Sequence, residues 1–407
     1  MMRMKININT IINLMAILLI WRCNYCTSMF FVNSFYTSGV FFGVFCVWLF
    51  LSGATKKDFR GQLINTGWPL MLFLIVNVSL DIIANGSISQ ESLNYIILFI
   101  LFSISIYYFD DYEINFKKKV VLLLIIDVFV KQIFSWQQLI LNPNILRQMS
   151  TSGADYSTIG TLIGDYSFVY ACAIMICAVL ACIGKKKNKY IEIVLMAFSI
   201  FSVLFVVKAS FFFAIMLTLV GCVLALFVKN KKTFVIIPIV TLLLLLALRI
   251  PLSNVLSDIS HYEIWSDVIQ EKIQDFSNYL RYGQDGAWMS SMRIDAIEHS
   301  MDTFFSYPLL GTQGLNRSLT PGNHSGWLDG LAQYGILRYP LFLLFLFKMF
   351  GSLLKNANQG KVYYISIIAL VFLGMINPII FPQLWVILFV FVPFLDSMCT
   401  KEEEILR

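Results

Sequence analysis

Residues 307–336 read Tyr307-Pro308-Leu309-Leu310-Gly311, then, after ten further residues, Gly322-Asn323-His324-Ser325-Gly326-Trp327-Leu328-Asp329, and finally Tyr334-Gly335-Ile336. They close a long polar stretch that begins near Pro251 and has hydrophobic segments on both sides. The three histidines of the chain, His261, His299 and His324, all fall in this stretch. Because histidine titrates near neutral pH, this stretch is where we expect chemistry.

The composition places the rest of the chain in a membrane. Of 407 residues, 58% are hydrophobic and 13% are charged, whereas soluble domains carry about 25% charged and less than about 50% apolar residues. The sequence therefore predicts an all-α polytopic membrane protein. In such a protein the formal net charge of +6 reports the orientation of the spans first, so it does not indicate nucleic-acid binding.

A membrane-spanning helix needs about 20 mostly apolar residues, and about twelve segments qualify. The first has no cleavage site of the kind that follows a signal peptide, so we interpret it as a span. The predicted spans are residues 8–22, 37–53, 66–84, 93–109, 119–136, 157–183, 190–207, 210–228, 233–249, 332–354, 361–380 and 383–399.

The basic residues predict the orientation of these spans. Lysine-rich clusters fall in every second connection, starting with the first residues of the chain, as the positive-inside rule requires. Both termini are then cytoplasmic and the long loop is extracytoplasmic. We expect nine spans in residues 1–249, the loop in residues 250–331, and three spans with a cytoplasmic tail in residues 332–407. Inside the loop, the patterns predict helices over 257–279 and 292–305.

Arginine is concentrated on the predicted outer side. The basic residues assigned inside are 17 lysines and 3 arginines, and those assigned outside are 7 arginines and 3 lysines. Arginine offers a planar fork that binds phosphate or carboxylate. Residues 250–331 hold ten acidic and four basic residues, so the loop is no general anion-binding surface. A few arginines in acidic surroundings indicate a defined anionic site, and codon usage is the alternative explanation.

His324 is the leading candidate for a reactive group. It lies in a glycine-rich loop at the outer mouth of a span, where an imidazole could accept a proton from a hydroxyl group. A structural histidine bonded to the backbone would show the same spacing. His261 and His299 lie in predicted helices, where packed or solvated side chains are the simpler interpretation. The histidines are widely spaced and no H-E-x-x-H pattern occurs, so we expect no metal site.

Ionisable residues in or beside the spans are further candidates. Lys208 falls in a very short outer turn, Arg147 lies in another outer loop, and Asp165 is expected well inside the sixth span. Asp127 and Lys131 are four residues apart, hence on one helical face and able to pair. Snorkelling of Lys208 and a structural role for Asp127 and Lys131 are the alternatives.

Several of these residues together resemble one protein family. Arg293, the turn at 307–311, Asn323-His324 and the run Ala332-Gln333-Tyr334-Gly335-Ile336 are similar to the block that closes the large periplasmic loop of the O-antigen ligase and O-antigen or capsular polysaccharide polymerase family. Lys208 with Ser210 resembles the short basic turn of that family. The predicted spans and the position of the loop agree with the family across most of the chain.

The sequence also departs from the family pattern at four places. Gln313 interrupts the usual G-x-G, Ser325 replaces the commoner asparagine, Val207 precedes Lys208 where a serine is usual, and Arg338-Tyr339 stands where a second glycine is common.

The resemblance implies a metal-independent glycosyltransferase that needs no cofactor and uses an undecaprenyl-diphosphate-linked glycan. Arg293 and Lys208 would stabilise the charge developing on the diphosphate. His324 would accept the proton of an acceptor hydroxyl, and direct displacement would invert the anomeric carbon. The substrate-binding residues that we expect in addition are Arg147, Arg281, Arg317, Asn323 and Tyr334.

The resemblance also implies partners and a location. The lipid-linked oligosaccharide would serve as donor and acceptor, membrane lipid would surround the spans, and a chain-length regulator protein is a candidate partner. The location would be the bacterial cytoplasmic (inner) membrane. The segment from Asp155 to Tyr170, with Gly160 and Gly164, resembles polymerases more than ligases. We therefore expect a polymerase of O-antigen or another surface polysaccharide, active in lipopolysaccharide biosynthesis.

Three alternatives stay open. A ligase would share the chemistry and transfer the glycan to lipid A–core. A transporter or flippase of lipid-linked sugars is less favoured, because no internal repeat is evident and the one long loop lies in one half of the chain. A structural assembly partner would tolerate every substitution in the loop.

Overall fold

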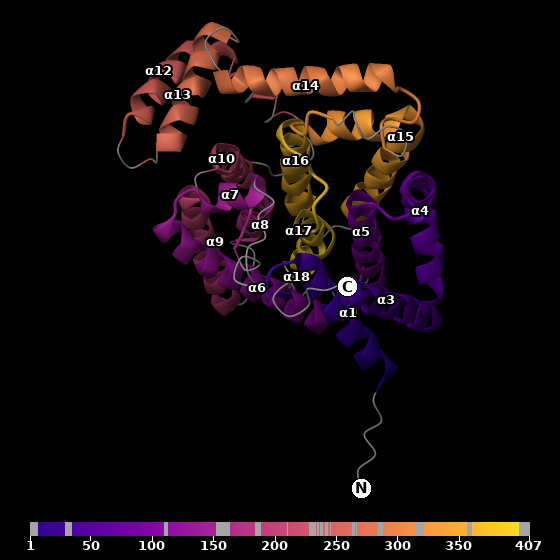
Figure 1. Ribbon diagram of the computed structural model, residues 1–407. Coiled ribbons are helices and arrows are strands. Elements are labelled where there is room, and N and C mark those ends of the chain that lie inside the picture. The colour runs from indigo at the N-terminus through magenta and orange to yellow at the C-terminus, as the bar shows by residue number, and fades with distance from the viewer. Residues whose placement is uncertain are drawn as a thin grey trace.

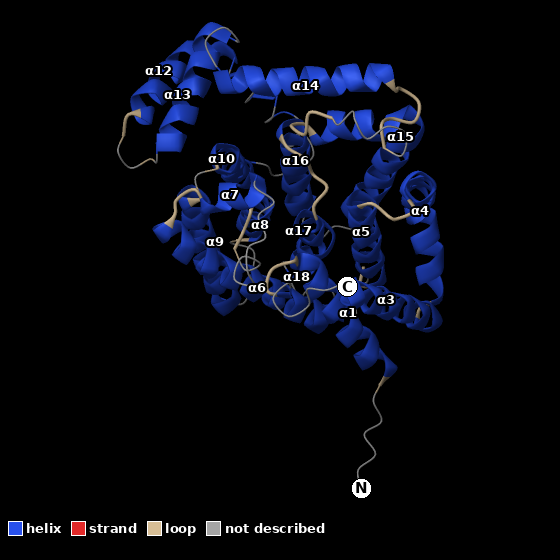
Figure 2. Cartoon of the chain, in the orientation of Figure 1, coloured by secondary structure: helices blue, strands red, loops and turns tan. Residues whose placement is uncertain are grey.

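The computed structural model describes residues 7–28, 35–109, 113–151, 163–183, 189–209, 211–227, 246–262, 267–283, 288–313, 321–355 and 360–398, together with single positions between 233 and 265. Within these residues every regular element is a helix and no strand occurs (Figure 2). The all-α class predicted from the composition is confirmed.

Five helices in the described part of the chain are long and apolar enough to cross a membrane. They are α4 (Lys57–Asn85), α5 (Gln90–Tyr107), α6 (Ile114–Leu141), α9 (Lys189–Lys208) and α15 (Gly326–Lys355). The other apolar helices are α1 (Ile8–Asn24), α3 (Phe35–Thr55), α8 (Tyr166–Cys182), α10 (Phe212–Phe227), α16 (Gly360–Ile376) and the continuous run of α17 (Pro382–Val386), a π-helical turn and α18 (Val392–Met398). The lengths and apolar composition of these helices support the conclusion that the chain is a membrane protein.

Each of these helices falls on a segment that the hydrophobic pattern predicts as a span. Most of the predicted span over 233–249 lies outside the described residues. The number of spans and the orientation of the termini therefore stay predictions.

Helix α8 lies in the interior of the bundle. Its side chains are mostly small or apolar and nearly all buried, and it packs against α9, α10, α16 and α17. The approach to α10 is so close that a Cβ on Gly221 would lie 1.9 Å from Cys177 Sγ. Small residues at helix contacts are typical of membrane bundles, where close packing drives helix association.

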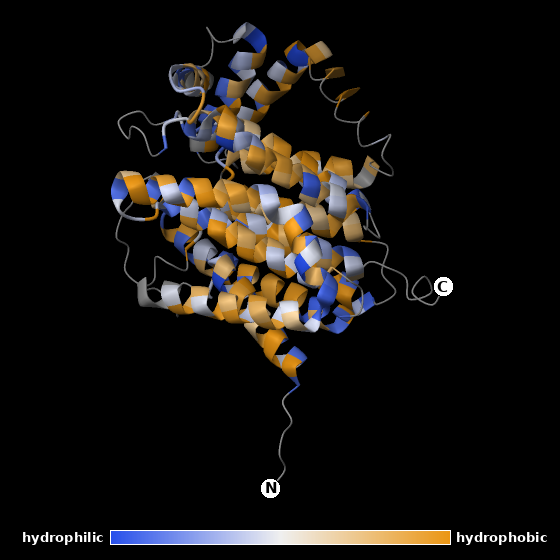
Figure 3. Ribbon diagram, turned by 90° about the vertical axis from the view of Figure 1, so that its right-hand side faces the viewer, coloured by the Kyte–Doolittle hydropathy of each residue, from blue (hydrophilic) through white to orange (hydrophobic). Residues whose placement is uncertain are grey.

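The outer face of the bundle is apolar. On α4, for example, Ile64, Trp68, Ile75 and Ile83 are 59%, 41%, 64% and 80% exposed. Figure 3 shows apolar residues along most of the stacked helices, and a more hydrophilic group of helices above them. Extended apolar surface of this kind marks a face that meets lipid or another protein.

The polar stretch folds into three helices within the described residues. Helices α12 (Arg249–Ser260) and α13 (Asp267–Tyr282) pair closely, and α14 (Trp288–Ser306) runs across the top of the bundle (Figure 1). The predicted helix over 292–305 is confirmed within α14, which ends just before Tyr307-Pro308. The predicted helix over 257–279 is wrong at its start, because the chain turns after Ser260.

Hydroxyl groups explain why α12 and α13 pair as two antiparallel helices. Ser253 Oγ donates to the Ser277 carbonyl (2.9 Å) and Ser277 Oγ donates to the Ser253 carbonyl (2.8 Å). Nearer the turn, Ser260 Oγ donates to Gln274 Oε1 (2.9 Å). An apolar face of α13 with Ile269 and Ile273 packs beneath them. In one continuous helix these hydroxyl groups would lose their partners, and the apolar face would lose its packing.

The expectation for Asp165 is also wrong. Its Oδ1 accepts hydrogen bonds from the N–H of Phe168 (3.0 Å) and from Ser167 Oγ (2.6 Å), so it caps the first turn of α8. Aspartate is favoured at this position because its carboxylate satisfies free N–H groups. Asp165 therefore lies at the beginning of the helix and not well inside it.

Asp127 and Lys131 join α6 to the end of α1. Asp127 accepts hydrogen bonds from Asn24 Nδ2 (2.7 Å) and from the N–H of Thr27 (3.0 Å). Lys131 Nζ donates to the carbonyl of Tyr25 (3.0 Å). These contacts favour the structural interpretation of the two residues, because each holds two helices together.

Candidate functional site

A cavity of about 600 Å³ opens where the loop meets the bundle. Its walls are the end of α4, the start of α5, parts of residues 312–323, the start of α15, and residues 378–380 after α16. The alternation of spans predicts all these segments on the outer side of the membrane. A concave site with converging polar groups is the default candidate for ligand binding, and such sites measure about 300–1,000 Å³.

One wall depends on a break in α15. Gly335 has φ 66° and ψ −179°, which interrupts the helix between Tyr334 and Ile336. The first part of α15 lies across the bundle below α14, and the second part turns down into it (Figure 1). Only glycine adopts this backbone conformation readily.

The backbone groups freed by the break bind the turn that follows α14. Four N–H groups donate across this junction, two in each direction. The bonds run from Ile336 to the Pro308 carbonyl (2.8 Å), from Leu337 to the Leu309 carbonyl (3.1 Å), from Thr312 to the Ala332 carbonyl (3.1 Å) and from Gln313 to the Gln333 carbonyl (3.0 Å). We call this set of four hydrogen bonds the backbone clamp.

Two glycines allow the backbone clamp to close. A Cβ on Gly335 would lie 2.4 Å from the Leu309 carbonyl oxygen, and a Cβ on Gly311 would lie 2.4 Å from the Gln333 carbonyl oxygen. Gly311 also has a positive φ of 66°. The motifs at 307–311 and 334–336 are therefore two halves of one structural unit.

Arg338 fastens the backbone clamp to α4. It is 1% exposed, and its Nη1 donates to Asn77 Oδ1 of α4 (2.7 Å). Its Nη2 donates to the carbonyls of Leu310 and Gln313, the latter at 3.0 Å, and its Nε donates to the carbonyl of Tyr334 (3.1 Å). The fixed fork of a guanidinium suits this set of acceptors.

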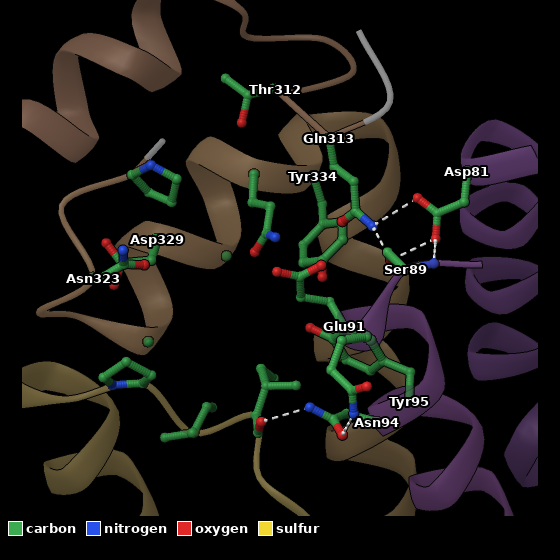
Figure 4. A pocket seen from close by; sticks show the side chains of 18 of the residues that line it. Asp81, Ser89, Glu91, Asn94, Tyr95, Thr312, Gln313, Asn323, Asp329 and Tyr334 are labelled. Carbon is green, nitrogen blue, oxygen red and sulfur yellow. Dashed lines mark hydrogen bonds between the residues drawn. The ribbon is translucent and has the colours of Figure 1, made fainter. Parts of the chain in front are cut away.

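Asp81 of α4 anchors a second wall. Its Oδ2 accepts from the N–H and the Oγ of Ser89, at 3.0 and 2.5 Å, and its Oδ1 accepts from Gln313 Nε2 at 3.2 Å. Ser89 also caps α5 by accepting from the N–H of Ser92 (3.2 Å). Gln313 therefore connects the loop with α4 and α5 through its side chain, as Figure 4 shows.

Asp329 anchors the opposite wall, which carries His324. Its carboxylate accepts from Ser300 Oγ of α14 (2.6 Å) and from the N–H of Ser325 (3.0 Å). Ser300 Oγ in turn accepts from the N–H of Gly322 (2.8 Å). Burial raises the pKa of the Asp329 carboxyl above its usual value, and the charge of His324 opposes this shift. The loop on both sides of His324 is thereby held at the rim of the cavity.

The predicted substrate-binding residues Asn323 and Tyr334 both line the cavity. Asn323 adopts a positive φ of 59°, and Tyr334 is 1% exposed. His324 directly follows Asn323 and is partly exposed, without itself lining the cavity.

The predicted cations lie elsewhere or outside the described side chains. Lys208 is the last residue of α9, is exposed, and does not line the cavity. Arg281 is exposed on α13, donates to Asn254 Oδ1 and lies over the ring of Tyr282. The cations whose side chains fall outside the description are Arg147 on α7 (Ile145–Thr151), Arg293 on α14, and Arg317, which is outside the described residues altogether.

Sequence reasoning missed several residues that shape the cavity. Asp81, Glu91 and Asn94 line it from α4 and α5, far from the loop in sequence. The one sequence feature that connects them with the site is their position at the outer ends of predicted spans. Asp329 belongs to the sequence motif at 322–329. Its spacing of four residues from Ser325 is one at which two residues lie on the same face of a helix.

In the described part of the chain, no group of three or more His, Cys, Asp or Glu side chains is placed to hold a metal ion. The sequence matches no protein-family profile and no curated protein.

Proposed function

We propose that this chain is a membrane glycosyltransferase, similar to the O-antigen ligase and polysaccharide polymerase family, with about twelve spans and the long loop outside the cytoplasm. It would join undecaprenyl-diphosphate-linked repeat units on the outer face of the cytoplasmic membrane. One observation carries the proposal. The loop of His324 is fixed at the rim of a polar cavity whose walls come from segments predicted on that same face.

The proposed reaction needs one bond made and one bond broken. The hydroxyl oxygen of the acceptor sugar attacks the anomeric carbon of the donor glycan. The bond from that carbon to the phosphate oxygen breaks, and undecaprenyl diphosphate leaves with the electron pair. The hydroxyl proton passes to His324, which is a suitable base near neutral pH. Attack from the face opposite the leaving group inverts the configuration of the anomeric carbon.

Each remaining residue has a physical role in this proposal. The diphosphate is a good leaving group and needs no general acid, but its developing negative charge needs cations. Arg293, which lies on α14, and Lys208 are proposed for this role. The Asp329 carboxylate would stabilise the positive charge that His324 acquires, because opposite charges at short range attract strongly in a partly buried site.

The test is surface polysaccharide from a deletion strain that carries His324→Ala or the unaltered chain on a plasmid. A gel of the deletion strain should show lipid A–core with one repeat unit and no ladder, and the unaltered chain should restore the ladder. His324→Ala, present at the same level by immunoblot, should not restore it. His261→Ala is the matched control, because His261 is exposed at the end of α12, away from the cavity lining.

Other outcomes would contradict the proposal in specific ways. Bare core with polymer still built on the carrier lipid would indicate a ligase. Lipid-linked single units retained on the cytoplasmic side would indicate a flippase. A full ladder with His324→Ala would remove His324 from the mechanism.

A further inference from the structure

We infer that the cavity binds an uncharged, hydroxyl-rich sugar residue, the acceptor end of the growing glycan, and that the diphosphate of the donor lies outside it. This inference rests on the proposed function and names the ligand class of one part of that site. It follows from three properties of the cavity wall: its hydrogen-bonding groups, an unsatisfied amide oxygen and its charge.

The wall offers both donors and acceptors at many points. Amide side chains line it from four segments of the chain, among them Asn85, Gln90, Asn323 and Gln333. An amide presents a carbonyl oxygen and an N–H₂ group, and a sugar hydroxyl both donates and accepts. Alternating donors and acceptors of this kind match a ring with several hydroxyl groups better than they match an apolar or a singly charged ligand.

Glu91 is the acid that is free to bind a ligand. Asp81 and Asp329 are already engaged by Ser89, Gln313, Ser300 and Ser325, as described above. Glu91 lies in the first turn of α5, is exposed, and makes no hydrogen bond with any described residue. Figure 4 shows it in the middle of the cavity, between the Asp81 wall and the Asp329 wall. A carboxylate in this position accepts hydrogen bonds from hydroxyl groups.

The floor of the cavity holds two buried tyrosine hydroxyls. Tyr95 and Tyr334 are each 1% exposed, and their rings meet edge to face with centroids 5.6 Å apart. The two hydroxyls lie close enough to interact with each other, whereas Gln313 Oε1 has no hydrogen-bond partner among the described residues. A buried polar group left unsatisfied destabilises the fold. We expect a ligand in the cavity to complete the hydrogen bond of the Gln313 oxygen after a small rotation of that side chain.

The charge of the wall disfavours a diphosphate. None of the described residues that line the cavity is a lysine or an arginine, and three of them are carboxylates. Arg338 lies behind Tyr334 with its guanidinium engaged by carbonyls and Asn77. Phosphate groups are bound in proteins by arginine, lysine or helix N-termini. The two helix N-termini in this wall, those of α5 and α15, each carry an acid in the first turn, Glu91 and Asp329. A neutral sugar avoids the repulsion that a diphosphate would meet here.

The experiment is binding to the purified full chain in lipid nanodiscs. The probes are oligosaccharides of one to three repeats, made by partial hydrolysis of the organism's own surface polysaccharide, and inorganic pyrophosphate. We expect the oligosaccharides to bind, and Glu91→Gln to weaken their binding about tenfold, or about 1.4 kcal/mol, because hydrogen bonds to a charged carboxylate are stronger than those to a neutral amide. Pyrophosphate at the same concentration should not displace them. Glu298→Gln, an exposed acid on α14 that does not line the cavity, should bind as the unaltered chain does.

Two results would overturn the inference. One is unchanged oligosaccharide binding in both Glu91→Gln and Asn94→Ala, each shown to be folded by an unaltered melting temperature. The other is displacement of the oligosaccharide by pyrophosphate. These results are separable from the proposed function, because the latter is decided by the polysaccharide ladder of the His324→Ala strain. If the oligosaccharides bind and the His324→Ala strain still makes a full polysaccharide ladder, the sugar site is supported and the proposed mechanism is contradicted.

Discussion

At the scale of single residues, Arg338 carries more of the site than its place in the sequence suggests. It is a buried cation whose hydrogen-bond acceptors are three backbone carbonyls, a further carbonyl at 3.3 Å on Gln333, and the side chain of Asn77. It also lies over the ring of Tyr334, 5.5 Å from the centroid. A single side chain thus joins the turn after α14, the break in α15, and α4.

We predict that Arg338→Lys destabilises the protein although the charge is kept. Lysine is a point charge without the planar fork, so some of these carbonyls would lose their partner, at about 1–3 kcal/mol for each buried group left unsatisfied. A lower melting temperature in detergent is the expected result. Arg249→Lys, at an exposed arginine, serves as the control, and equal melting temperatures for both variants would contradict the role given to Arg338.

The sequence predicted some residues of the site and missed others for one physical reason. His324, Asn323 and Tyr334 were recognisable because they sit in a short local motif. Glu91 lines the same cavity from α5, far from the loop in sequence. The hydrogen bond between Gln313 and Asp81, which joins the same parts of the chain, spans 232 residues. Gln313 and Arg338, which depart from the pattern of the family that the sequence resembles, make contacts that only the packed structure reveals.

At the scale of elements, the hydrophobic runs predicted where the helices lie. They did not predict where a helix breaks or begins, because single backbone positions determine those points. Lengths of apolar sequence place α4, α5, α6, α9 and α15 well, because spanning a membrane demands a run of apolar residues. They could not show that α15 breaks at Gly335 or that α8 begins at a capping aspartate. Those two features depend on single backbone positions, to which hydropathy is insensitive.

We predict that Gly335→Ala opens the backbone clamp. A Cβ would collide with the Leu309 carbonyl in a left-handed conformation, and strain of this kind costs about 1–3 kcal/mol. Gly351→Ala is the matched control on the same helix, where a Cβ meets nothing within 4 Å and alanine favours the helix by about 0.5–1 kcal/mol. The check is the melting temperature of each variant together with hydrogen exchange at Ile336 and Leu337, which should speed up only in Gly335→Ala.

At the scale of the whole molecule, the proposed site requires one orientation in the membrane. Helices α12–α14 and the starts of α5 and α15, which line the cavity, gather at one end of the bundle (Figure 1). The lysine clusters predicted to be cytoplasmic lie in the other set of connections. The segments predicted on the outer side therefore meet at this end of the bundle.

We predict that Ile88→Cys reacts with a membrane-impermeant maleimide added outside intact spheroplasts, and that Asp58→Cys reacts only after the membrane is opened. Both positions are exposed, Ile88 between α4 and α5 and Asp58 at the start of α4. The unaltered chain reports the labelling of native cysteines, most of which are buried in the described residues. The reverse pattern would place the cavity in the cytoplasm and would contradict the proposed reaction with an outer-face substrate.

The docking of α15 against the end of α16 has a consequence for biosynthesis. The N–H of Gly326 donates to the Asn377 carbonyl (3.1 Å), and Trp327 Nε1 donates to the Val371 carbonyl (3.0 Å). Residues 378–380 then close the last side of the cavity. Because a chain is synthesised from its N-terminus, the walls on α4 and α5 are made first. The segments that complete the cavity are made more than two hundred residues later. The cavity is therefore absent from every nascent intermediate, and a cell meets a competent protein only once the final helices have entered the membrane.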